Sequence, residues 1–263
     1  MKISKIIEHL QHNTPWVDYE HTRDVVICGN TDTDVEKVAV CWVATKKVLE
    51  KAKEENIHFV ITHENFLYAE STSFYKGLLN SRKWKLNFCK ENDITVYRCH
   101  DGWDQFPIYG VADTLANVSG IKFNDRVNNS FYHDADINMT VQEIAQHFAN
   151  GLLPYGCQNV EILGNPNKTI HKLAMGVGAE TNYEIMHRMG GECFVIADDG
   201  CCNWIEFQWC LDNDIPLVIL HHSSNEIPGI ENMANYLNKE LPECSFVKFD
   251  EGYQFTCIKG ENI

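Results

Sequence analysis

The chain has 263 residues, and 44% of them are hydrophobic, which is enough for a substantial buried core in one or two domains. Its formal charge of −15 at pH 7 and its lack of a Lys/Arg-rich run argue against nucleic acid as a main partner. No apolar run is long enough to span a bilayer, and Glu8 and His9 interrupt the apolar start, so we expect a cytoplasmic protein without a membrane partner.

The first half of the chain is predicted to alternate helices and strands. Its hydrophobic periodicity indicates helices near residues 2–12, 45–55 and 73–91, and strands near 24–28, 37–43, 58–62 and 94–99. This order is typical of an α/β fold with a parallel sheet.

The middle of the chain is predicted to carry a helix near 108–119, a β-rich patch around 121–138 and a further helix from Thr140. Thr140 and Glu143 form a capping-box pattern for that helix, and we expect Gly151 to close it. A second alternating set of strands and helices then runs toward the carboxyl end.

Two stretches of the chain match each other. Residues 38–64 and 173–199 align without a gap, and the tripeptide Phe-Val-Ile recurs at 59–61 and 194–196. A long repeat in two copies predicts an α/β protein of two similar half-domains with mixed sheets, derived from an internal duplication and sharing a metal-binding cleft. We expect domains at 1–125 and 126–263; in an intertwined alternative, the C-terminal strands return to the first half.

Three predicted strands end in histidine and acid, and the residues concerned are His63 with Glu64, His100 with Asp104, and His222 with Glu226. Because ligands bind at the carboxyl ends of strands in an open α/β sheet, we expect these side chains to form one shared metal site. Imidazole and carboxylate ligands without cysteine suit Zn, Fe, Mn or Mg.

Other interpretations of these patterns stay open. A single histidine at a strand end is more often a hydrogen-bonded surface residue than a ligand. The segment Gly176-Val177-Gly178 imitates a dinucleotide-binding turn but lacks the third glycine, so we expect no nucleotide cofactor there. Most of the eleven cysteines are expected to be reduced and buried, whereas the adjacent Cys201-Cys202 either contacts a ligand or begins a helix.

With these residues assembled, the chain resembles the Nif-three-like (Ngg-interacting-factor-like) dinuclear-metal-centre family, whose members are labelled GTP cyclohydrolase one type two homologues. The likeness covers nearly the whole chain. Three family elements carry it: a Thr-His-His-Pro element at Thr62-His63-Glu64-Asn65, a His-x-x-x-Asp element at His100 to Asp104, and a Gly-His-x-x-x-Glu element at His221 to Glu226.

The resemblance implies a set of metal ligands and one further site residue. The implied ligands are His63, Glu64, Asp104, His222 and Glu226, with Glu226 as a bridging carboxylate. Glu64 stands where the family has a second histidine, which should favour Mn, Fe or Mg over Zn or leave one metal position weak. His100 lines the site, either as a general acid/base or as a residue that orients the ligands.

These features predict a divalent-metal-binding protein with one or two ions. We expect a metal-dependent hydrolase that uses a metal-activated water on a nucleotide-like or phosphorylated heterocyclic small molecule. The alternative is a non-catalytic metal-binding scaffold or a regulatory interaction protein. The resemblance also implies a ring-shaped homohexamer with its sites facing an internal cavity.

Overall fold

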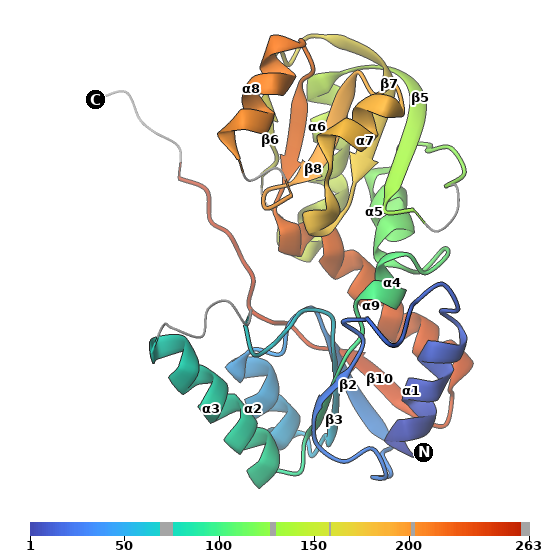
Figure 1. Ribbon diagram of the computed structural model, residues 1–263, viewed down its shortest axis with the longest axis vertical. Helices are drawn as coiled ribbons and strands as arrows, with labels where there is room; N and C mark the ends of the chain where they lie inside the picture. Colours follow the sequence, from blue (N-terminus) through green and yellow to red (C-terminus); the bar gives the residue numbers. More distant parts are fainter. Residues whose placement is uncertain (69–75, 127–129, 158, 201–202, 259–263) are drawn as a thin grey trace. The chain divides into compact units, whose positions relative to one another are not determined.

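The computed structural model describes residues 1–68, 76–126, 130–157, 159–200 and 203–258, which form two compact units (Figure 1). The first unit comprises Met1–Tyr109 and Ile230–Gly252, and the second comprises Gly110–Gly229 and Tyr253–Ile263. The sequence-based boundary lies at residue 125. In the structure, the chain leaves the first unit after Tyr109 and returns to it at Ile230. Cys201 and Cys202 lie outside the described residues.

The first unit is built on a five-stranded sheet of order β1-β4-β3-β2-β10. Its strands are β1 (Val26–Cys28), β2 (Lys37–Cys41), β3 (Phe59–Thr62), β4 (Thr95–Arg98) and β10 (Ser245–Lys248). The strands β4, β3, β2 and β10 are parallel, and β1 pairs antiparallel at the edge. The strand β10 therefore brings the C-terminal part of the chain back to the sheet of the first half.

Helices cover both faces of this sheet (Figure 1). The first unit contains α1 (Ile3–His12), α2 (Lys46–Glu54), α3 (Lys76–Glu91), α4 (Asp101–Asp104) and the later turns of α9 (His222–Glu240). All four residues of β3 are buried, as expected of a parallel strand covered on both sides. On the face that carries α2 and α3, Val48, Leu49 and Cys89 pack against Val60 and Val96 of the sheet.

The second unit has a five-stranded sheet of order β5-β7-β8-β9-β6. Its strands are β5 (Tyr132–Thr140), β6 (Glu161–Leu163), β7 (Thr169–Gly176), β8 (Cys193–Ala197) and β9 (Leu217–Leu220). The central strands β7, β8 and β9 are parallel, whereas β5 and β6 pair antiparallel at the two edges. The helical segments of this unit are α5 (Val111–Ser119), α6 (Val141–Leu152), η2 (Leu153–Tyr155), η3 (Gly178–Glu180), α7 (Tyr183–Arg188), α8 (Trp204–Asp212) and the first turns of α9.

The capping of α6 confirms one sequence-based expectation and corrects another. Thr140 accepts from the Glu143 N–H, and Glu143 accepts from the Thr140 N–H, so the capping box is present. Gly151, however, lies inside the helix and does not close it. A Cβ at Gly151 would lie 1.9 Å from the Val118 carbonyl oxygen, so glycine here permits the close approach of α6 to α5.

The predicted α/β class with mixed sheets is confirmed. The matched stretches of sequence occupy equivalent strands, because Phe59-Val60-Ile61 lies in β3 and Phe194-Val195-Ile196 lies in β8. In each sheet, a run of parallel strands, four in the first unit and three in the second, lies beside an antiparallel edge strand. An origin by duplication and a shared cleft stay predictions.

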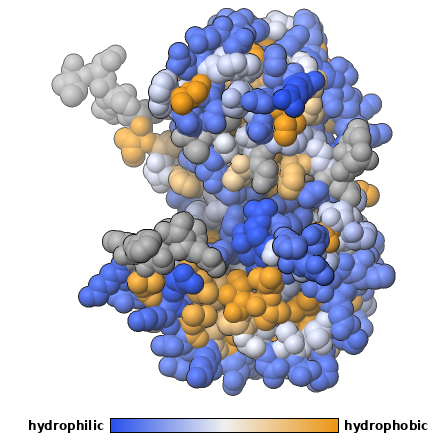
Figure 2. Space-filling view, in the orientation of Figure 1, coloured by the Kyte–Doolittle hydropathy of each residue, from blue (hydrophilic) through white to orange (hydrophobic). Residues whose placement is uncertain are grey.

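The visible surface is mostly hydrophilic, with separate patches of hydrophobic residues, one of them on the first unit (Figure 2). Within the described residues, no helix combines the length and the apolar character that crossing a bilayer requires.

Candidate metal centre

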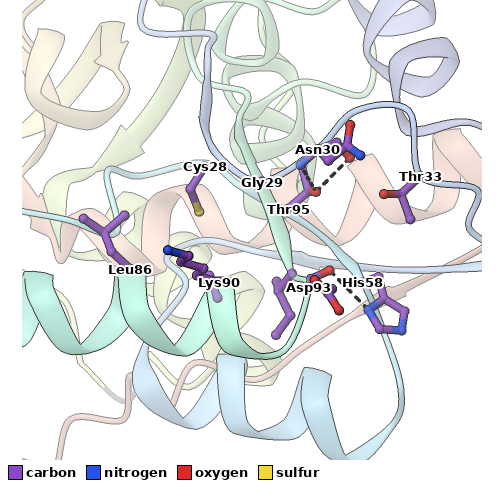
Figure 3. A pocket seen from close by; sticks show the side chains of 11 residues that line it. Cys28, Gly29, Asn30, Thr33, His58, Leu86, Lys90, Asp93 and Thr95 are labelled. Carbon is purple, nitrogen blue, oxygen red and sulfur yellow. Dashed lines mark hydrogen bonds between the residues drawn. The ribbon is translucent and has the colours of Figure 1, made fainter.

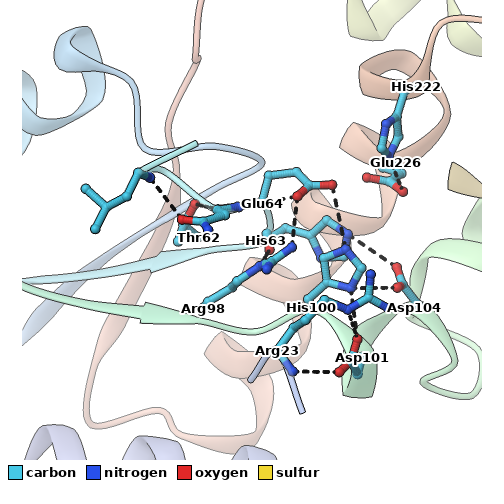
Figure 4. A network of polar contacts seen from close by, with 12 residues as sticks. Arg23, Thr62, His63, Glu64, Arg98, His100, Asp101, Asp104, His222 and Glu226 are labelled. Atoms are coloured by element: carbon cyan, nitrogen blue, oxygen red, sulfur yellow. Dashed lines mark hydrogen bonds and ion pairs between the residues drawn. The ribbon is translucent and has the colours of Figure 1, made fainter. Parts of the chain in front are cut away.

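A buried cluster of imidazole and carboxylate lies at the carboxyl ends of β3 and β4 in the first unit (Figure 4). His63 follows β3, and His100 and Asp104 follow β4, and these two strands are parallel neighbours. One potential ligand atom from each of these three residues lies within 4.8 Å of the other two. The residues are 0%, 6% and 4% exposed, so the three groups share a site that is largely closed to solvent.

The imidazole of His63 is oriented by a backbone carbonyl. Its Nδ1 donates to the Cys99 carbonyl oxygen at 3.1 Å, because a carbonyl can only accept. In the neutral ring the lone pair therefore lies on Nε2, which is 3.3 Å from Asp104 Oδ1. A lone pair facing a carboxylate needs a positive charge between them, either a proton or a metal cation.

His100 lies among three carboxylates. Its Nδ1 is 3.0 Å from Asp104 Oδ2 and 3.2 Å from Asp101 Oδ1, and its Nε2 is 3.6 Å from Glu64 Oε1. Burial lowers the pKa of His100, but the charge of Asp104 and the hydrogen bonds to all three acids raise it well above its ordinary value. The ring of His100 also stacks on that of His63, with centroids 4.4 Å apart.

Glu64 is held between a histidine and an arginine. Arg98 Nη2 lies 3.0 Å from Glu64 Oε2, and Arg98 Nε donates to the His63 carbonyl oxygen at 3.1 Å. Burial raises the pKa of Glu64, but the hydrogen bond from His100 and the nearby positive charges hold it below its ordinary value. Glu64 is therefore ionised, with Oε1 directed at His100.

Asp24 positions the short helix α4 that carries Asp104. Its carboxylate accepts from the backbone N–H groups of His100, Asp101 and Gly102, the last two at 2.8 and 2.9 Å. Burial raises the pKa of Asp24 despite these hydrogen bonds. Sequence reasoning did not find Asp24, because its partners lie more than 70 positions away and no local motif marks it.

The second unit places His222 and Glu226 together at the start of α9 (Figure 4). His222 Nε2 is 2.8 Å from Glu226 Oε1, and His222 Nδ1 is 2.6 Å from Asp199 Oδ2. Burial lowers the pKa of His222, but the charge of Glu226 and the hydrogen bond to Asp199 raise it to about 11. As at His63, one ring nitrogen is held by an oxygen and the other faces a carboxylate.

The end of β8 supplies two acids that support this pair. Asp198 accepts from His221 Nδ1 at 2.9 Å and from the His222 N–H at 3.0 Å, and Asp199 accepts from the His222 ring. No role was assigned to Asp198 or Asp199 from the sequence. Their position at a predicted strand end, one strand before His222, was the signal that could have assigned them a role.

The glycine-rich turn after β7 lies beside His222 and Glu226 in the second unit. Gly178 has φ +54°, and a Cβ there would lie 2.3 Å from Glu226 Oε1 and 3.3 Å from His222 Nε2. The Gly178 N–H also donates to Asn225 Oδ1 at 3.3 Å. A short 3₁₀ turn, η3, begins at Gly178, and α7 begins five residues later at Tyr183.

Both groups of residues have the donor chemistry of a divalent-cation site. Their available atoms are imidazole nitrogens and carboxylate oxygens, which suit Zn, Fe and Mn. In each group an imidazole Nε2 faces a carboxylate, a position that a cation can take from the proton. The structure thus brings together His63, Glu64, His100 and Asp104 in one unit, and His222 and Glu226 in the other; that both groups serve one centre stays a prediction.

Comparisons with known proteins agree with the family resemblance. A Clostridium perfringens protein named GTP cyclohydrolase 1 type 2 homolog is 26% identical over 252 residues, which are 92% of this chain and 93% of that protein. The structure of Staphylococcus aureus protein SA1388 covers 98% of this chain and 99% of its own, with a TM-score of 0.78 at 18% identity. Reduced HcgD from Methanocaldococcus jannaschii covers 95% and 98%, with a TM-score of 0.75 at 19% identity.

These structural likenesses show a shared fold. The family model described as Duf34/NIF3 (NGG1p interacting factor 3) matches residues 1–251. Because that match spans nearly the whole sequence, the chain belongs to the Duf34/NIF3 family.

Proposed function

We propose that this protein is a metal-dependent hydrolase whose divalent ions, one or two in number, are bound by His63, Glu64, Asp104, His222 and Glu226. The observation that carries the proposal is the oriented His63 ring, which presents Nε2 to the buried Asp104 carboxylate at 3.3 Å. Such an arrangement, with Nδ1 fixed by a carbonyl, is typical of histidines that ligate metals.

The chain's own residues have distinct roles in this proposal. The Cys99 carbonyl and Asp199 fix the rings of His63 and His222 so that each presents Nε2. A bound divalent cation supplies Lewis acidity, which makes water a competent nucleophile near neutral pH. His100 holds a proton on Nδ1 between Asp101 and Asp104, and it acts either as the general acid/base or as the residue that orients Asp104.

The proposed substrate is a nucleotide-like or phosphorylated heterocyclic molecule. Support for this class comes from the name of the C. perfringens relative, GTP cyclohydrolase 1 type 2 homolog. Glu64 stands where the family has a histidine, and a carboxylate differs from an imidazole in shape and in its hydrogen bonds, so the preferred substrate is expected to differ from that of relatives with histidine at this position.

A non-catalytic metal-binding scaffold is the second candidate. The burial of His63, His100 and Asp104 favours it, because side chains that are 6% exposed or less offer a substrate little surface. In that case the ions would be stored or would stabilise the fold, and the protein would act through an interaction partner.

The deciding experiment measures metal content and turnover on the same protein. The full chain is stripped with a chelator, reloaded with Zn, Mn or Fe(II), and incubated with GTP and small phosphoesters under single-turnover conditions. We expect turnover with at least one metal, and its loss in Asp104→Asn. His58→Ala is the matched control, since His58 lies just before β3, at the other end of the strand from His63.

Each outcome separates the candidates. Stoichiometric metal binding without turnover of any substrate would favour the scaffold. A His63→Ala variant that keeps the full metal content and affinity of the native protein would refute the ligand assignment. The homohexamer that the resemblance implies is a further part of the proposal, and light scattering on the purified chain tests it.

A further inference from the structure

A cavity of about 700 Å³ lies in the first unit, away from the acid and imidazole cluster (Figure 3). His58 and Thr95, which line it, stand at the amino ends of β3 and β4, whereas His63 and His100 follow the carboxyl ends of the same strands. The cavity is therefore at the opposite end of the sheet from the candidate metal ligands. Cys28, Cys89 and Lys90 are also part of its lining.

Cys28 reaches this cavity from an irregular edge strand. The pairing of β1 with β4 shifts register between Val26 and Cys28, and such a bulge redirects the side chain that follows. Gly29, the next residue, has φ +103°, and a Cβ there would lie 2.4 Å from Thr95 Cα. The turn after β1 therefore depends on glycine and holds the half-buried Cys28 thiol at the cavity wall.

Cys28 and Cys89 line the same cavity, so the two thiols share one space in the fold. Cys89 lies on α3, on the same helix face as Leu86 and the exposed Lys90. The hydrogen bond from Cys89 lowers the pKa of Cys28. The same hydrogen bond, together with burial, raises the pKa of Cys89.

The other described cysteines lack this combination of features. Cys41, Cys99 and Cys193 are almost completely buried, and burial raises the pKa of each. Cys257 is exposed but does not line this cavity. Reactive thiols are those that combine thiolate character with access, and within the described residues Cys28 meets both conditions best.

We propose that Cys28 and Cys89 are a dithiol site that is oxidised to a disulfide by low-molecular-weight disulfides entering this cavity. Lys90 and His58 are part of the cavity lining, so a reagent that carries carboxylates fits better than a cationic one, although Asp93 also lines the cavity. The site is independent of the proposed metal chemistry.

The reaction is an ordinary pair of thiol–disulfide exchanges. The Cys28 thiolate attacks one sulfur of the reagent, forming a mixed disulfide and releasing the other half as a thiolate, which takes a proton from water. Cys89 loses its proton to water, and its sulfur attacks the Cys28 sulfur and displaces the second thiolate. Two protein thiols lose two electrons, and the reagent disulfide becomes two thiols.

The test maps disulfides in the full-length protein. The reduced chain is incubated with oxidised glutathione, quenched with N-ethylmaleimide, digested and analysed by mass spectrometry. We expect a peptide containing Cys28 linked to one containing Cys89. In Cys89→Ser the mixed disulfide should remain on Cys28, and in Cys28→Ser the yield of modified Cys89 should fall by about tenfold, since its thiol is buried and protonated.

Two comparisons distinguish a reactive pair from a structural one. Cys89→Ala removes the hydrogen-bond donor, so the pH profile for modification of Cys28 should move to higher pH, whereas Cys257→Ser should behave as the native chain does. Native protein in which Cys28 reacts no faster than Cys257, or in which no peptide links Cys28 to Cys89, would overturn the proposal. This peptide map needs no variant, so the test does not depend on whether the substituted chains fold.

Discussion

Gly178 lies directly against the Glu226 carboxylate, with room for no side chain between them: a Cβ there would lie 2.3 Å from Glu226 Oε1. We therefore predict that Gly178→Ala displaces Glu226 and lowers the affinity for divalent ions by at least about tenfold, the usual cost of disturbing the surroundings of a ligand. Isothermal titration with Zn or Mn measures the change.

The control for this substitution is Gly190→Ala. Gly190 has φ +83°, but a Cβ there meets nothing within 4 Å. Both variants should lose about 1 kcal/mol of unfolding free energy from the left-handed backbone, and only Gly178→Ala should also lose metal affinity. Equal metal affinities in the two variants would contradict the role assigned to Gly178.

Asp24 provides a second prediction, because its carboxylate accepts from three successive N–H groups at the start of α4. Asp24→Ala leaves these buried donors without their acceptor, so the free energy of unfolding should fall by about 2 kcal/mol. Urea denaturation measures this loss. Asp18→Ala, which removes an exposed carboxylate, should change stability by less than about 0.5 kcal/mol.

The buried Lys85 predicts a specific dependence of stability on pH. Its Nζ donates to the Phe66 carbonyl oxygen at 2.6 Å, and burial lowers its pKa from 10.5 to about 8. Between these values the unfolded chain binds more protons than the folded chain, so this residue makes stability increase as the pH rises from about 8 to 10.5. Below pH 8 the amine is charged in both states, and its burial costs the full amount.

The variant Lys85→Met should lack this contribution. The free energy of unfolding, measured by urea denaturation at several pH values between 7 and 10.5, should rise less steeply with pH in the variant than in the native chain. Lys90→Met is the control, because Lys90 is exposed on the same helix. Identical slopes for the native chain and Lys85→Met would show that the buried amine is not perturbed.

The sequence-based prediction that His63 and His222 serve the same centre can be tested by a double-mutant cycle. For one centre, the loss of binding free energy in His63→Ala/His222→Ala should differ from the sum of the single losses by more than about 0.5 kcal/mol. The pair His58→Ala/His222→Ala should be additive within that limit. An additive result for His63 and His222 would indicate independent sites.

The elements near the site were predictable because their signals are local. The buried apolar run 59–61 followed by His63 identifies β3 and the potential ligand at its carboxyl end. The four-residue spacing of His222 and Glu226 matches one turn of α9. Thr140 and Glu143 likewise reveal their helix through the capping box. Each of these patterns lies within a few residues of sequence.

The remaining features depend on contacts between distant positions. Asp24 caps α4 from 76 residues away, and Gly151 is needed because Val118 lies against it in space. Cys28 and Cys89 line one cavity only after α3 has packed beside β1. A single sequence shows which residue types are present at these positions, but not which partners the fold will bring to them.

Arg98 offsets the negative charge of the acid at position 64. The guanidinium takes one oxygen of Glu64 at 3.0 Å, so the pair carries no net charge, as a neutral imidazole at that position would. The acid at position 64 therefore adds no net negative charge to the site once Arg98 is counted. A chain that exchanged Glu64 for histidine while keeping Arg98 would gain an uncompensated cation, so these two positions should be altered together in any attempt to rebuild the family pattern.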